Sequence, residues 1–121
     1  MNIAEIEVFP ALTGNQTSQR ESEEHMAEPV ILINAFEVPP ADADAFVAAW
    51  QQARDYLRSQ PGYIDTVLHQ SITPDAEFQF VNVARWQTAE DFIAAVQSPG
   101  FRESAAGLAA YRPHPALYRS V

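Results

Sequence analysis

The 121-residue sequence contains no cysteine and no lysine, and its seven basic residues, all arginine, face sixteen acidic ones. Without cysteine the chain can form no disulfide, thiolate metal site, iron–sulfur ligation or cysteine nucleophile. The net charge of −9 argues against nucleic acid, because phosphate recognition needs a positive surface. No segment approaches the ~20 apolar residues of a membrane span, and Glu5 and Glu7 interrupt any secretory signal. We therefore expect a cytoplasmic protein that binds neither nucleic acid nor membranes.

Motifs for cofactors and metals are missing as well. The glycines are too far apart for a dinucleotide or phosphate loop: Gly14, Gly62, Gly100 and Gly107. Histidines and carboxylates do not occur at metal-ligand spacing. We therefore expect no metal and no cofactor. An enzyme built on this chain would have to use an apolar cavity, amides, an indole, tyrosines and one imidazole.

The composition changes near Pro29. Residues 1–28 carry six acidic residues and one arginine, and residues 13–28 are too polar to bury a core, which predicts an acidic N-terminal arm or linker. Residues 3–12 are more apolar and predict either a docked strand or a disordered tail. Residues 29–121 have the length and composition of one globular domain.

The hydrophobic pattern of this domain alternates between strand and helix periods. Strands are predicted at residues 30–38, 63–70, 77–86 and 117–121. Helices are predicted at residues 41–59 and 88–97, with a further helical piece at 101–110. The order strand, helix, strand, strand, helix, strand predicts an α+β fold of the ferredoxin-like βαββαβ type. Its four-stranded antiparallel sheet would carry both helices on one face.

The other face of that sheet has no cover within the chain. It would expose four apolar side chains: Ile31, Ile33, Val81 and Val83. We therefore expect a homodimer in which two such sheets pack face to face.

Two asparagines interrupt apolar rows on strands that this fold places side by side. Asn82 is the only polar side chain in the alternating row of the third strand, and Asn34 occupies the same kind of position in the first strand. Taken alone, either amide is best explained as hydrogen-bonded to a backbone group or a neighbouring loop. The two together favour an apolar pocket with directed hydrogen bonds. Trp86, on the row of Asn82, offers an indole donor, but taken alone it is better explained by core packing or as a lid at the sheet edge.

Several segments resemble the antibiotic biosynthesis monooxygenase (ABM) family. They are VNVARW at residues 81–86, TAEDF at 88–92, PGY at 61–63 and SPGF at 98–101. The resemblance covers residues 29–121 and leaves the acidic arm unmatched. It implies the dimeric α/β barrel, in which two ferredoxin-like protomers join through their sheets.

The best understood members of that family are cofactor-independent monooxygenases that oxidise phenolic polyketides to quinones with molecular oxygen. The resemblance implies that Asn82 and Trp86 contact the substrate oxygens and that His69 matches a strand-two histidine, which makes these three the expected catalytic residues. The expected substrate-binding residues are Asn34, Phe92, Phe80 and Phe36. Phe92 stands where the polyketide enzymes have a tyrosine, which removes a hydroxyl that could help proton transfer.

Other functions remain open in the sequence. A haem-degrading branch of the family shares Asn34, but its haem-ligating histidine and its helix tryptophan would fall near Ala105 and Ala95, which disfavours haem degradation. Other relatives act on small quinols or cyclise polyketides. The alternative of a different class is a non-catalytic barrel that binds an aromatic ligand or serves as an accessory protein. Oxygen consumption with hydroquinones and anthrones would distinguish a monooxygenase from such a non-catalytic protein.

His69 can belong to the site in only one of two strand registers. If odd residues of the second strand oppose even residues of the third, His69 lies opposite Phe78 or Phe80 and on the face of Asn82. In the other register Leu68 and Gln70 lie beside the Asn82 row, and His69 faces the dimer side. The turn between the strands permits both, and the family resemblance favours the first.

Overall fold

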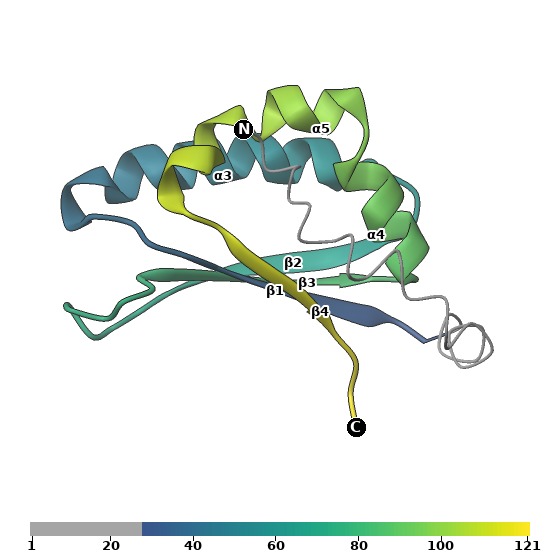
Figure 1. The fold of residues 1–121 in the computed structure, drawn as a ribbon, viewed down its shortest axis with the longest axis horizontal. Coiled ribbons are helices and arrows are strands. Elements are labelled where there is room, and N and C mark those ends of the chain that lie inside the picture. Colours follow the sequence, from purple (N-terminus) through teal and green to yellow (C-terminus); the bar gives the residue numbers. More distant parts are fainter. Residues whose placement is uncertain (1–27) are drawn as a thin grey trace.

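The computed structural model describes residues 28–121, which form one sheet covered on one face by helices (Figure 1). The strands are β1 (Val30–Phe36), β2 (Tyr63–Gln70), β3 (Phe80–Trp86) and β4 (His114–Tyr118). They are antiparallel and lie in the order β2–β3–β1–β4. This confirms the predicted ferredoxin-like βαββαβ fold. The docked strand proposed for residues 3–12 lies outside the described residues.

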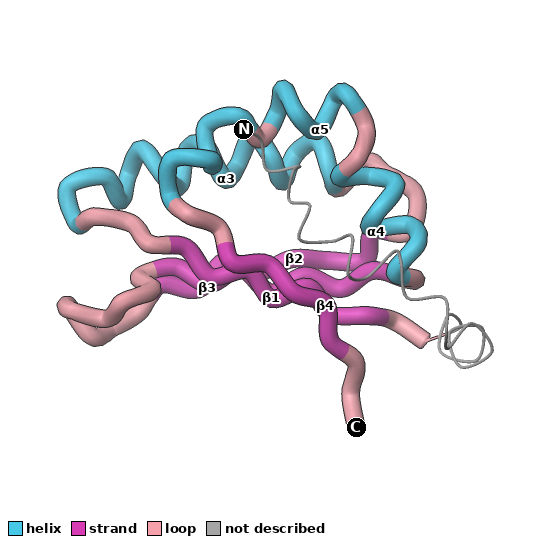
Figure 2. The backbone as a smooth tube through the Cα atoms, in the orientation of Figure 1, coloured by secondary structure: helices cyan, strands magenta, loops and turns pink. Residues whose placement is uncertain are grey.

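The helices pack as a single layer above the sheet (Figure 2). They are α3 (Ala43–Leu57), α4 (Ala89–Val96) and α5 (Pro99–Ser104), with the 3-10 segments η2 (Pro40–Asp42) and η3 (Ala106–Tyr111). Thr88, which stands three residues before Asp91 in a Thr-x-x-acid pattern typical of helix starts, caps α4 by accepting a 3.0 Å hydrogen bond from the backbone N–H of Asp91. Ser98 caps α5 in the same way. In the part of the chain that the structure describes, no helix is long and apolar enough to cross a membrane.

The last strand differs from its prediction, since it begins at His114 and includes Pro115. A proline is tolerated because β4 is an edge strand, paired only with β1, so one of its sides needs no backbone donor. The third strand also starts later than predicted, at Phe80. The helical piece predicted at 101–110 is divided between α5 and η3.

The core lies between the helix layer and one face of the sheet. From α3 it takes Phe46, Trp50 and Ala53, which form an apolar stripe along one side of the helix. The sheet contributes alternate residues of β1 and β3, and the most deeply buried side chains are Trp86, Phe36, Phe46 and Phe92. Phe36 and Phe80 both pack on Phe46, each at 4.8 Å between ring centroids.

The register between β2 and β3 contradicts the prediction for His69. Tyr63 pairs with Trp86, but the register then shifts by one residue, so that Asp65 pairs with Arg85 and His69 with Val81. Such a shift is typical of a β-bulge, in which two residues of one strand oppose one of the other. Without it, regular pairing from Tyr63 would have placed His69 opposite Phe80. The extra residue, Ile64, therefore sends His69 to the face away from the helices.

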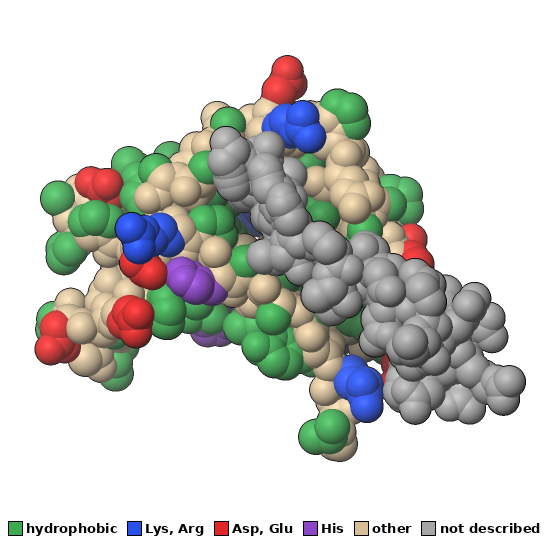
Figure 3. Space-filling model, viewed as in Figure 1, with side chains coloured by type: hydrophobic (Ala, Val, Ile, Leu, Met, Phe, Trp, Pro, Cys, Tyr) green, Lys and Arg blue, Asp and Glu red, His purple; other side chains and the backbone are tan. Residues whose placement is uncertain are grey.

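That second face of the sheet is largely apolar, and none of the described residues covers it. It carries alternate residues of all four strands: Ile31, Ile33, Val67, Val81, Val83 and Tyr118. Val67 and Tyr118 are 54% and 51% exposed. Hydrophobic side chains are visible on this side of the molecule in Figure 3. On the same face, Arg85 of β3 donates three hydrogen bonds to the Asp65 carboxylate of β2, at 2.6, 3.1 and 3.2 Å.

Candidate functional site

A small cavity of about 60 Å³, partly open to solvent, lies between the sheet and the helices. The strands supply its floor, α3 and α4 line it from the helix layer, and α5 and η3 add one side chain each. Most lining residues are apolar, so the few polar groups among them determine what the cavity can recognise.

Asn34 and Asn82 lie directly opposite each other on β1 and β3 and both line the cavity. This confirms the predicted juxtaposition of the two amides. Asn34 Oδ1 accepts a 2.9 Å hydrogen bond from the backbone N–H of His114 at the start of β4. The amide is therefore anchored by its oxygen, and its NH₂ group donates to none of the described residues.

Asn82 is held in the same way by a side chain that the sequence did not point to. Thr66, on β2, donates a 2.6 Å hydrogen bond from its hydroxyl to Asn82 Oδ1. Asn82 is 9% exposed, and its NH₂ group also has no partner among the described residues. An amide oriented by its oxygen presents two N–H donors in a fixed direction.

Trp86 supplies the third polar group. Its side chain is fully buried, packed edge-on against Tyr63 and Phe92 at centroid distances of 5.6 and 5.5 Å. The indole Nε1–H has no hydrogen-bond partner among the described residues. A buried donor without a partner costs roughly 1–3 kcal/mol, so such groups in native proteins call for a functional explanation. An acceptor on a bound ligand would supply one.

The other expected site residues divide into two groups. Phe36 and Phe92 line the cavity, as expected. Phe80 is buried but lies against Phe46 in the core and does not line the cavity. His69, expected as a catalytic residue, is exposed on the opposite face of the sheet because of the bulge in β2.

Sequence reasoning missed three polar residues that line the cavity: Arg54, Tyr63 and Thr66. Thr66 could have been identified only if the β2–β3 register were known, because the register shows that Thr66 lies on the same face of the sheet as Asn82. Burial raises the pKa of Tyr63 above its ordinary value, an effect that outweighs the opposing influence of Arg58 and Arg54. Tyr63 therefore remains a neutral hydroxyl donor throughout the physiological range.

The donor set does not favour a metal or haem site. Among the described residues that line the cavity there is no histidine, aspartate or glutamate. Ala95 and Ala105, near the positions where the haem-degrading branch has its tryptophan and iron ligand, are buried alanines. The described part of the chain also contains no group of three or more His, Asp or Glu side chains that could hold a metal ion.

The family follows from the comparison of this fold and sequence with known proteins. The family model for antibiotic biosynthesis monooxygenase matches residues 29–107, and the chain belongs to this ABM family. No curated protein matches the sequence significantly.

Solved structures agree with this assignment. A candidate monooxygenase from Shewanella loihica PV-4 is 41% identical, with a TM-score of 0.70 over 78% of this chain and 95% of that one. A mutant of SnoaB, a cofactor-independent oxygenase from Streptomyces nogalater, is 26% identical, with a TM-score of 0.68 over 78% of this chain and 94% of that one. A candidate antibiotic biosynthesis monooxygenase from Nitrosomonas europaea, at 17% identity and TM-score 0.66 over 78% and 92% of the two chains, shares the fold.

Proposed function

We propose that this protein is a cofactor-independent monooxygenase that oxidises an aromatic phenol, anthrone or quinol with molecular oxygen. The observation that carries the proposal is the buried, unpartnered indole N–H of Trp86 on the same cavity wall as the oriented amide of Asn82. The similarity to SnoaB supports the reaction class.

The reaction requires no redox group from the protein, because the substrate supplies the electrons. For an anthrone, the ring CH₂ is oxidised to a quinone carbonyl by one O₂. One oxygen atom becomes the new carbonyl, the other leaves with both hydrogens as water, and the carbon provides the four electrons. The carbanion or phenolate form of the substrate is the species that reacts with oxygen. Neutral N–H donors from Asn82 and Trp86 would stabilise its oxygen as negative charge develops there.

The cavity offers little assistance for removing the substrate's proton. The described lining residues include no side chain that titrates near neutral pH, since His69 lies on the other face and Phe92 has no hydroxyl. The substrate would then lose its proton to water or hydroxide. We expect kcat to rise with pH through the pKa of the bound substrate, which the cavity donors lower by binding the anion.

The same observation favours an aromatic-ligand-binding or accessory protein as the second candidate, since binding needs the donors but no base. The test is oxygen consumption with a panel of anthrones and hydroquinones in chelator-treated buffer. Oxidation above the spontaneous rate, lost in the Asn82→Ala variant, supports the monooxygenase. Binding without oxygen consumption overturns it in favour of the second candidate.

We also propose that the protein acts as a homodimer joined through the open faces of two sheets. The support is the apolar character of that face, whose central residues Ile33, Val81 and Val83 have no cover within the described chain. A stable interface of this kind buries about 1,000 Å² or more in total. Light scattering that gives a monomer at micromolar concentration would overturn the proposal.

A further inference from the structure

Arg54 is the only charged side chain among the described residues that line the cavity. It comes from α3, in the helix layer, whereas Asn34, Asn82, Thr66 and Trp86 come from the sheet. The cavity therefore has neutral hydrogen-bond donors on one wall and a cation on the facing element. Two different kinds of group on a ligand would satisfy this arrangement.

The guanidinium of Arg54 is held in place by two contacts. Its Cζ lies 5.2 Å from the centroid of the Trp50 ring, one helical turn earlier, which also lines the cavity. Its Nε and one terminal nitrogen donate to Asp55 Oδ1 at 3.2 and 3.1 Å. The other terminal nitrogen has no partner among the described residues. The side chain is 30% exposed, so it is accessible to a ligand without being fully solvated.

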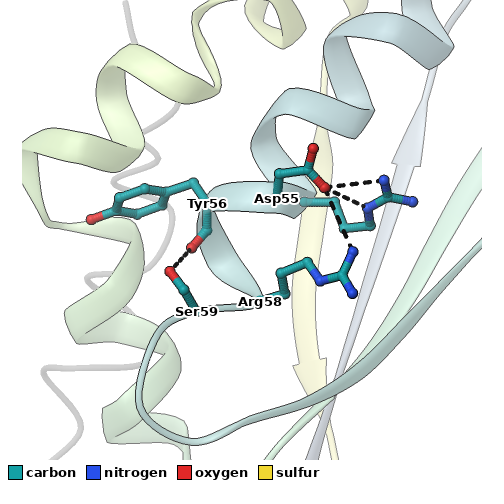
Figure 4. Close-up of polar contacts among 5 residues, drawn as sticks. Asp55, Tyr56, Arg58 and Ser59 are labelled. Atoms are coloured by element: carbon teal, nitrogen blue, oxygen red, sulfur yellow. Dashed lines mark hydrogen bonds and ion pairs between the residues drawn. The ribbon is translucent and has the colours of Figure 1, made fainter.

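Asp55 does not cancel the positive charge at this end of α3. Its carboxylate also lies 3.8 Å from the guanidinium of Arg58, so one acid is shared by two cations. Figure 4 shows Asp55 and Arg58 on one side of the helix end, with the ring of Tyr56 directed to the other side. Asp55 is 61% exposed, so solvent screens its attraction for Arg54. The group of three retains a net charge of +1 in a chain of net charge −9.

A second donor lies near this cation. Tyr63 also lines the cavity, and both Arg54 and Arg58 act on it electrostatically. Its hydroxyl has no partner among the described residues, and burial keeps it protonated. A guanidinium and a hydroxyl donor together are suited to a carboxylate, which accepts several charge-assisted hydrogen bonds.

We propose that the aromatic ligand carries an anionic substituent, such as a carboxylate, and that Arg54 and Tyr63 bind this substituent. The inference rests on the proposed function for the aromatic part of the ligand, but it concerns binding and requires no turnover. Arg54 is thereby a specificity-determining residue. It selects acidic aromatic compounds over their neutral esters.

The test is calorimetric titration without oxygen, using 1,4-dihydroxy-2-naphthoate and its methyl ester. These probes share the quinol ring and differ in the charge of one substituent. Because a hydrogen bond to a charged group is worth roughly 1.5–3 kcal/mol, Arg54→Gln should weaken binding of the acid about tenfold or more. Binding of the ester should change less than about twofold, because it lacks the charge that Arg54 recognises.

Three further variants test whether Arg54 recognises the carboxylate directly, rather than through a general electrostatic effect or an effect on folding. Arg58→Gln removes the same charge from a residue outside the cavity lining and should weaken acid binding far less than Arg54→Gln. Asp55→Asn releases Arg54 and should strengthen acid binding. Arg54→Lys keeps the charge without the planar fork and should give an intermediate affinity. Thermal melting establishes that each variant is folded.

The outcomes distinguish this inference from the proposed reaction. Equal weakening of acid and ester by Arg54→Gln, or no weakening of the acid, overturns the inference and leaves the monooxygenase proposal standing. Selective loss of acid binding in a protein that consumes no oxygen supports the inference and overturns the monooxygenase. Failure of the wild-type protein to bind either probe counts against both.

Discussion

Thr66 and Asn82 lie on neighbouring strands, and the Thr66 hydroxyl donates a 2.6 Å hydrogen bond to the amide oxygen of Asn82. The bond fixes which end of the amide is free to donate to a ligand. Because it exists only in the bulged register of β2, it ties the chemistry of the cavity to the backbone of that strand.

Thr66→Val removes this hydroxyl while keeping the side-chain shape. We expect a loss of about 1 kcal/mol in the free energy of unfolding and about a tenfold fall in kcat/KM for the oxidised substrate. The fall in rate follows because the Asn82 amide is then free to rotate. Denaturant titration and oxygen-electrode kinetics measure the two effects, and an unchanged kcat/KM would show that the amide needs no orientation.

His69→Ala is the matched change on the other face of the same strand. Since the His69 side chain lies away from the cavity, we expect kcat to stay within about twofold of wild type, the range of a residue that makes no transition-state contact. A loss of about a hundredfold would indicate general-base catalysis and would contradict the register described above.

Trp86→Phe separates catalysis from stability. The change removes a buried donor that has no described partner, which offsets part of the packing lost with the larger ring. We expect destabilisation well below the ~3–5 kcal/mol of a Trp→Ala truncation. The rate of oxidation should fall about a hundredfold, as when one preorganised donor to a developing anion is lost. A variant that is strongly destabilised but fully active would assign Trp86 to packing alone.

Val83→Asp tests the dimer. It places a carboxylate in the middle of the open apolar face, where an interface would have to bury it without a partner at a cost of about 3–5 kcal/mol. Light scattering should show dissociation to monomers. Ala94→Asp adds the same charge on an exposed position of α4 and should leave the assembly unchanged. Equal behaviour of the two variants would exclude this face as the interface.

The Asp65–Arg85 pair predicts a pH dependence of stability. Its hydrogen bonds to Arg85 lower the pKa of Asp65 below the ordinary value. The pair therefore stabilises the fold above about pH 4, the ordinary Asp pKa, and loses this contribution as the pH falls through the lowered value. At pH 7 the melting temperature of the wild-type protein should exceed that of the Asp65→Asn variant. The difference should be at most a few degrees, because the pair is about half exposed. The difference should shrink toward pH 3, and a constant difference would contradict the prediction.

The fold could be predicted from the sequence because hydrophobic periodicity determines both the element order and the buried faces. The pairing of Asn34 with Asn82 was predictable for the same reason, since each is the only polar residue in its row. The position of His69 was not, because a bulge is a backbone irregularity and the side-chain alternation around Ile64 shows no sign of it. Arg54 was missed because a helical arginine beside the apolar stripe has the pattern of an ordinary solvent-facing residue.

The bulge in β2 also determines where the strand tolerates a change in length. Removing Ile64 would leave Asp65 opposite Arg85 and Thr66 opposite Ala84, so everything beyond it would keep its side of the sheet. Removing Val67 instead would bring His69 opposite Asn82, on the face of the sheet that the helices cover. Two single-residue deletions, three positions apart, would thus have opposite effects. One is absorbed, and the other exchanges the inner and outer surfaces of the strand beyond it and moves an imidazole to the helix-covered side of the sheet.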